Sequence, residues 1–99
     1  MQRRVYITHL RPEYRAAYLA AHQNIAAELL ERYRIAGMKS CGVYLRNDVL
    51  VLVTEAEDLD KAQLTLAEDP VDQEWQRYLK PMKADGDYEK MGEIFRADW

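Results

Sequence analysis

A stripe of apolar and aromatic side chains between Glu13 and Ala36 constrains the fold of this 99-residue chain more than any other feature. Its members recur at three- and four-residue steps, the spacing that places side chains on one side of an α-helix. They are Tyr14, Tyr18, Ala21, His22, Ile25, Leu29, Tyr33 and Ala36, and the opposite side carries Arg15, Gln23, Ala27, Glu31 and Arg34. The pattern predicts one helix that ends at Gly37 and lies on an apolar partner.

Runs of β-branched and aromatic residues can supply that partner. Residues 4–10 predict a first strand, which Arg11-Pro12 ends. Residues 40–45 and 49–55 predict two more strands, and the short connection Arg46-Asn47-Asp48 is typical of a hairpin. These two strands are therefore expected to pair antiparallel.

The C-terminal half predicts two short helices and a last strand. Asp58 can cap a helix over residues 59–67, and after Asp69-Pro70 a further helix is expected over residues 71–79, which Pro81 ends. Residues 83–88 are expected to form a loop. Met91, Ile94 and Phe95 indicate a final strand, which Gly92 and Glu93 interrupt.

This order of elements predicts an α+β fold, a ferredoxin-like antiparallel sheet with helices on one face, built as a single domain over residues 1–99. A sheet covered on one face leaves the other face open. Pairing two copies face to face would bury it, so we expect a homodimer. The functional site is expected between sheet and helices, or between the two sheets.

Charge and cysteine content exclude several classes of partner. The net charge of -3 provides no basic field, so neither nucleic acid nor an anionic membrane surface is an expected partner. No apolar run resembles a signal peptide or a membrane span. Cys41 is the single cysteine, which excludes an internal disulfide and fits a reducing, cytoplasmic location. The His and Cys spacing indicates no metal site.

Two histidines are candidates for proton chemistry. His22 belongs to the apolar stripe four residues after Tyr18, so its side chain is expected to face the sheet. A histidine there is either a hydrogen-bonded core group or an acid-base catalyst that titrates near neutral pH. His9 lies near a strand end on the face of Val5 and Ile7, where a polar or capping role is the expected one.

Aromatic residues form the second group of candidates. Seven tyrosines and two tryptophans stand against one phenylalanine, which favours rings that combine an apolar face with a hydrogen-bonding tip, as sugar binding requires. Tyr18, Tyr44 and Trp75 are the best placed. Tyr6, Tyr14 and Tyr33 are interpreted as residues at the edge of the core, and Cys41 as a small buried packing residue.

The spacing Tyr18-x-x-x-His22, followed by Glu28-Leu29, resembles the L-rhamnose mutarotase family. The resemblance covers nearly the whole chain and continues through Gly37, Tyr44-Leu45, Glu55, Trp75, Tyr78, Met82 and Glu93-Ile94-Phe95. It implies a dimeric α+β barrel, an isomerase that interconverts the α and β anomers of L-rhamnose or a related deoxyhexose without metal or cofactor. It also implies His22 as proton donor, substrate contacts from Tyr18 and Trp75, and Tyr44 as a neighbour of the sugar.

The chain departs from the family pattern at several pocket positions. Asn24, Ala26 and Ala27 replace a proline and a Trp-Pro pair, Cys41 replaces a tyrosine, and Gln76 replaces the second of two tryptophans. Cys41 and Gln76 would therefore shape the substrate contacts differently, and the substrate would be a relative of rhamnose. Two alternatives stay open: a cofactor-free monooxygenase-like enzyme of the same barrel architecture, and a non-catalytic sugar-binding module.

Overall fold

An antiparallel sheet forms one layer of the molecule in the computed structural model, which describes residues 1–84 and 87–99. Its strands are β1 (Gln2–His9), β2 (Met38–Arg46), β3 (Val49–Ala56) and β4 (Glu89–Met91), in the spatial order β2-β3-β1-β4. Val5 on β1 pairs with Val53 on one side and Met91 on the other. The longest strands, β1, β2 and β3, thus form the continuous part of the sheet.

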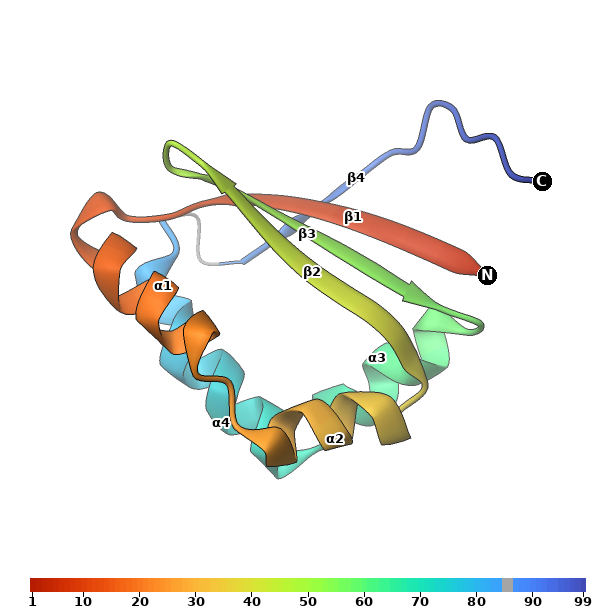
Figure 1. Ribbon diagram of the computed structural model, residues 1–99, viewed down its shortest axis with the longest axis horizontal. Coiled ribbons are helices and arrows are strands. Elements are labelled where there is room, and N and C mark those ends of the chain that lie inside the picture. The colour runs from red at the N-terminus through yellow and green to blue at the C-terminus, as the bar shows by residue number, and fades with distance from the viewer. Residues whose placement is uncertain (85–86) are drawn as a thin grey trace.

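The helices form the second layer. They are η1 (Pro12–Tyr14), α1 (Arg15–Gln23), α2 (Ala27–Ile35), α3 (Leu59–Ala67), α4 (Pro70–Leu79) and η2 (Lys80–Met82). Figure 1 shows α1, α2, α3 and α4 together on one side of the sheet, with the other side uncovered by helices. The predicted ferredoxin-like α+β arrangement is confirmed. Among the described residues, none of the helices is long and apolar enough to cross a membrane.

The expectation of one continuous helix over residues 13–36 is wrong. The helical backbone stops at Asn24, and Ala26 is extended with φ -61° and ψ 136° before α2 begins. The amide of Asn24 reaches back to the carbonyl of Ala20 at 3.4 Å, a local hydrogen bond of the kind that competes with helix continuation. The apolar stripe nevertheless runs across the break, so α1 and α2 both face the sheet.

The β2–β3 hairpin is confirmed, with a tighter turn and longer strands than expected. Arg46 pairs with Val49, so the connection is only Asn47-Asp48. Asn47 has φ 53°, in the left-handed region that asparagine tolerates better than most residues. The two helices after the hairpin begin close to their predicted starts. The side chain of Asp58 caps α3 by accepting from the backbone N–H of Lys61, and that of Asp69 caps α4 by accepting from the backbone N–H of Val71.

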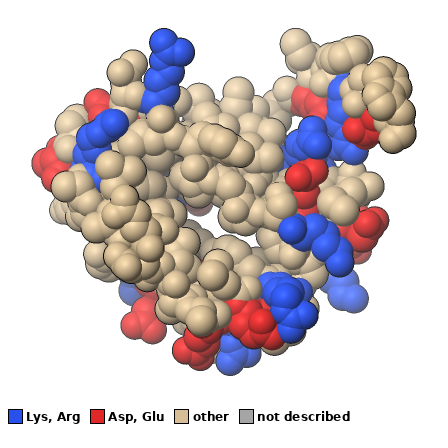
Figure 2. Space-filling model, in the orientation of Figure 1, with Lys and Arg blue, Asp and Glu red and all other residues tan. Residues whose placement is uncertain are grey.

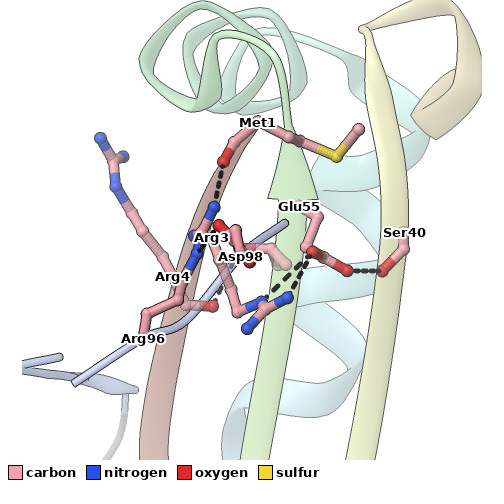
Figure 3. Close-up of polar contacts among 8 residues, drawn as sticks. Met1, Arg3, Arg4, Ser40, Glu55, Arg96 and Asp98 are labelled. Atoms are coloured by element: carbon pink, nitrogen blue, oxygen red, sulfur yellow. Dashed lines mark hydrogen bonds and ion pairs between the residues drawn. The ribbon is translucent and has the colours of Figure 1, made fainter.

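The C-terminal segment differs from its prediction. The last strand, β4, ends at Met91, and Ile94 and Phe95 lie beyond it, 100% and 82% exposed. Arg96 attaches this tail to the start of the chain by donating to the carbonyl of Met1 at 2.8 Å (Figure 3). Part of the predicted 83–88 loop lies outside the described residues.

The two faces of the sheet differ in character. Thr8 on β1 and Leu10 directly after the strand are buried on the face that meets the helices, where Thr8 pairs with Leu50. Leu10, Tyr18, Leu50, Leu79 and Met82 form the main buried cluster. His9, one position along β1, is exposed and points to the opposite face, so the face of Val5 and Ile7 is the outer one.

Candidate active site

A cavity of about 780 Å³ lies between the inner face of the sheet and the helices. In the space-filling view a hollow opens between these two layers, and charged side chains gather toward the periphery of the molecule (Figure 2). The volume falls within the range of small-molecule sites in proteins. Aliphatic residues of β2 and β3 form one wall, and α1, α2 and α4 contribute aromatic and polar groups to the other.

His22 lies in this cavity with a defined orientation. Its Nδ1 is 2.8 Å from the carbonyl oxygen of Tyr18, one helical turn earlier. A carbonyl only accepts, so Nδ1 carries the proton and donates, and a neutral His22 keeps its lone pair on Nε2. The imidazole stacks on the Tyr18 ring at 4.2 Å and meets the Trp75 ring edge-on at 5.3 Å between centroids. Two aromatic rings and one hydrogen bond therefore fix a proton acceptor in the cavity.

A pair of phenols lies beside the histidine. The hydroxyl of Tyr18 is 3.2 Å from that of Tyr88, and the Tyr18 side chain is buried. Burial raises the pKa of both phenols above the usual tyrosine value, and for Tyr18 the bond to Tyr88 adds to the rise. The Lys83 ammonium lies 4.5 Å from the centroid of the Tyr88 ring, and burial lowers its pKa. Both phenols thus stay protonated at neutral pH and act as hydrogen-bond donors.

A second cluster of polar side chains lies on the side of the cavity that α2 and α4 form. The hydroxyl of Tyr33 donates to Asp72 at 2.8 Å, and the amide of Gln76 donates to the same oxygen of Asp72 at 3.3 Å. Burial, followed by the negative charge of Asp72, raises the pKa of the Tyr33 phenol. Cys41 reaches this cavity from β2. These four side chains come from three separate elements.

The cavity brings together most of the residues that the sequence singles out. His22, Tyr18, Trp75, Cys41 and Gln76 all line it. Tyr44 does not, because alternation along β2 places it on the outer face of the sheet, where it is 63% exposed. The expectation of a buried Cys41 is wrong, since the residue is exposed, and the open cavity beside it is the reason.

Sequence reasoning missed several lining residues. Tyr33 is more than a residue at the core edge, because it lines the cavity and binds Asp72. Asp72 carried a usable signal: it lies three and four positions before Trp75 and Gln76, hence on the same side of α4. Tyr88 and Lys83 follow the last helix in irregular chain, where no periodicity indicates which way a side chain points.

No group of three or more His, Cys, Asp or Glu side chains in the described part of the chain could hold a metal ion. The polar groups that line the cavity include the imidazole of His22 together with phenol, carboxylate, amide and ammonium groups. Such a set can exchange protons with, and hydrogen-bond to, a small polyhydroxylated molecule.

The fold and the cavity together define a small α+β protein whose cavity is lined by aromatic and titratable side chains. A family model for L-rhamnose mutarotase matches residues 3–97, so the chain belongs to the L-rhamnose mutarotase family. No curated protein matches the sequence.

Solved structures show the same fold. An L-rhamnose mutarotase from Formosa agariphila superposes with a TM-score of 0.79 at 14% identity, over 99% of this chain and 100% of that one. An antibiotic biosynthesis monooxygenase gives 0.67 at 14% identity, over 95% and 99% of the two chains. The tetracenomycin F2 cyclase of Streptomyces glaucescens gives 0.64 at 18% identity, over 100% and 99%. At these identities the likeness concerns the fold alone.

The raised tyrosine pKa values predict a loss of stability at alkaline pH. The pKa of the folded-state phenol of Tyr18 lies above the unfolded value of 10.0, so the stabilisation is complete below about pH 10. It is lost as the pH rises further, because the unfolded chain then releases the proton that the folded chain retains. Each such tyrosine should lower the free energy of unfolding by up to about 1.4 kcal/mol for each pH unit above 10. Urea unfolding of the parent and of Tyr18→Phe at pH 8 to 11.5 measures this, and equal slopes would contradict it.

Proposed function

We propose that this protein is a mutarotase that interconverts the α and β anomers of L-rhamnose or a related hexose, with His22 as its acid-base catalyst. The observation that carries the proposal is the orientation of the imidazole. Nδ1 is held by the carbonyl of Tyr18, and Nε2 remains with a lone pair in a cavity walled by Tyr18 and Trp75. Family membership agrees with this assignment.

The chemistry requires two proton movements, which these groups can manage. In ring opening, neutral His22 accepts the proton of the anomeric hydroxyl at Nε2 while the bond between C1 and the ring oxygen breaks. The proton that His22 accepts is relayed to the ring oxygen through a bound water, since the raised pKa of Tyr18 disfavours release of the Tyr18 proton. The carbonyl carbon then presents its other face, and reclosure returns both protons. No net proton is gained or lost in the cycle.

The remaining lining suits a sugar. The Trp75 ring offers an apolar face to the C–H groups of a pyranose, and the hydroxyls of Tyr18 and Tyr88 offer hydrogen bonds. A monooxygenase-like enzyme acting on flat aromatic molecules would need a more uniformly apolar cavity than one that contains Asp72, Gln76 and Lys83. The polar lining therefore favours the sugar.

Exchange NMR tests the proposal directly. Saturation of the α-anomer resonance of L-rhamnose should be transferred to the β anomer faster in the presence of the protein, and the same experiment extends to a panel of aldohexoses. Binding without faster exchange would favour the sugar-binding module. If no sugar in the panel exchanges faster, the catalytic assignment is wrong.

We also propose that the working form is a homodimer that covers the outer face of the sheet. Val5, Ile7, Val51 and Val53 share that face, and none of the helices in the described part of the chain lies on it (Figure 1). The tail beside it exposes Ile94, Phe95 and Trp99 almost completely, which is unusual for a monomer. The cytoplasmic location stays a prediction from the sequence.

Sedimentation equilibrium should therefore give twice the chain mass of 11.6 kDa. Phe95→Asp should shift the protein toward monomer, because the charge would have to be buried at the interface. Leu64→Asp is the matched control, since Leu64 is also exposed but lies on α3 on the helical side. A monomeric parent protein at micromolar concentration would refute the dimer.

A further inference from the structure

We propose that the end of the cavity formed by Tyr33, Cys41, Asp72 and Gln76 is a polar subsite that selects a sugar with a hydroxyl group where L-rhamnose carries its methyl group. This inference rests on the proposed mutarotase function and specifies its substrate class. The preferred substrates would be uncharged aldohexoses with a hydroxymethyl group, rather than 6-deoxyhexoses.

Asp72 is the centre of this subsite. It is 7% exposed, yet it lines the cavity, and no ion pair joins it to a cation among the residues described. Its partners are neutral donors: the hydroxyl of Tyr33 at 2.8 Å and the amide of Gln76 at 3.3 Å, both to Oδ1. A carboxylate offers about four acceptor positions, so these two bonds leave Asp72 with unused capacity.

Gln76 adds complementary groups. Its Nε2 lies 3.3 Å from Asp72 and 3.5 Å from the hydroxyl of Tyr33, and its Oε1 is a further acceptor. A sugar hydroxyl can donate one hydrogen bond and accept another. It can therefore donate to the carboxylate of Asp72 or to Oε1 of Gln76, and accept from Nε2 of Gln76. A methyl group in the same place would exclude water from these polar atoms without replacing the lost bonds.

The subsite lies close to Trp75 on α4. Trp75, which meets the His22 ring at 5.3 Å, lies next to Gln76 and three residues after Asp72 on α4. Three residues of helix correspond to a rise of about 4.5 Å. In a pyranose, C5 is joined to the anomeric carbon through the ring oxygen. A sugar on the Trp75 ring with its anomeric carbon at His22 therefore reaches the subsite when its C5 substituent is turned toward Asp72.

Space and charge narrow the substrate class further. On the opposite wall Cys41 is small and open to the cavity, which leaves room beside Asp72 for an additional oxygen atom. A sugar acid would bring a second carboxylate close to Asp72, and like charges in a partly desolvated site repel strongly. The subsite therefore fits a neutral hydroxyl rather than an acidic group.

L-Mannose and L-rhamnose provide a matched test, because they differ only in the hydroxyl on C6. We expect kcat/KM for anomer exchange, measured by saturation-transfer NMR, to favour L-mannose by about tenfold or more, the scale of one hydrogen bond to a charged group. Asp72→Asn and Gln76→Leu should each reduce this ratio toward one. Glu74→Gln removes an exposed carboxylate from the same helix and should leave the ratio unchanged.

The outcomes separate this inference from the function on which it rests. Faster exchange of both sugars with no preference for L-mannose, or equal loss on both in Asp72→Asn, would leave the mutarotase assignment standing and overturn the subsite. Exchange of neither sugar would overturn the function. In that case the affinity of the protein for each sugar is measured by titration, with protein NMR chemical shifts as the readout. Tighter binding of L-mannose supports the subsite, and equal affinity for the two sugars refutes it. Thermal unfolding of each variant checks that it is folded.

Discussion

Replacing His22 with alanine is expected to reduce the enzyme-dependent rate of anomer exchange by about 10²- to 10⁴-fold, the usual contribution of a general acid-base group. The substitution removes the Nε2 lone pair, and neither phenol can replace it because burial raises the pKa of Tyr18 and Tyr88. Saturation-transfer NMR with the best sugar of the panel measures the effect. The fold should persist, since His22 is only half buried and lies in the last turn of α1.

His9→Ala is the matched control for this experiment. His9 is the other histidine of the chain, and it is exposed on the outer face of the sheet, away from the cavity. The control variant should exchange anomers at the parental rate. A parental rate in His22→Ala, or an equal loss in both variants, would show that His22 is not the catalytic group.

Replacing Leu50 with alanine is expected to lower the free energy of unfolding by about 2 to 5 kcal/mol. Leu50 on β3 is 0% exposed and belongs to the cluster with Leu10, Tyr18, Leu79 and Met82, which joins the sheet to α1, α4 and η2. Truncation would remove burial and leave a cavity. Small domains are stable by only about 5 to 15 kcal/mol, so a large part of the stability would be lost. Urea unfolding measures the change.

Leu64→Ala provides the comparison for Leu50. Leu64 lies on α3 and is 68% exposed, so its truncation should cost no more than about 0.5 kcal/mol. Equal costs at the two positions would mean that the Leu50 cluster is not the centre of the core. The same variant pair also bears on the site, because Leu50 packs with Tyr18, whose carbonyl orients His22.

Local sequence patterns predicted those structural features that depend on residues only a few positions apart. Asp58 marks the start of α3 because its side chain can reach an unpaired backbone N–H a few residues later, a preference that is local by nature. The stripe from Tyr14 to Ala36 correctly assigned Tyr18 and His22 to the side that faces the sheet. It could not reveal the break at Asn24, since the residues on either side of the break keep the same spacing.

Candidate residues on helices were easier to place than those on strands. Steps of three and four residues place Trp75 and Gln76 on the same side of α4 as Asp72, whichever element that side packs against. On a strand, alternation separates two faces but does not say which is inner. Tyr44 and Cys41 are therefore on opposite faces by sequence, and only the packing of helices on the Cys41 face decided that Cys41 reaches the cavity while Tyr44 does not.

The sequence by itself determined the α+β fold class, the approximate positions of β1, β2, β3, α3 and α4, and the presence of Tyr18 and His22 on the side of the helical stripe that faces the sheet. These features follow from periodicity, turn residues and capping, which act over a few positions. Tertiary structure alone decided that Tyr88 meets Tyr18 across 70 positions of chain, and that Tyr33 meets Asp72 across 39. Such contacts depend on how α1, α2, α4 and the irregular chain after η2 pack on one sheet, which no local pattern encodes.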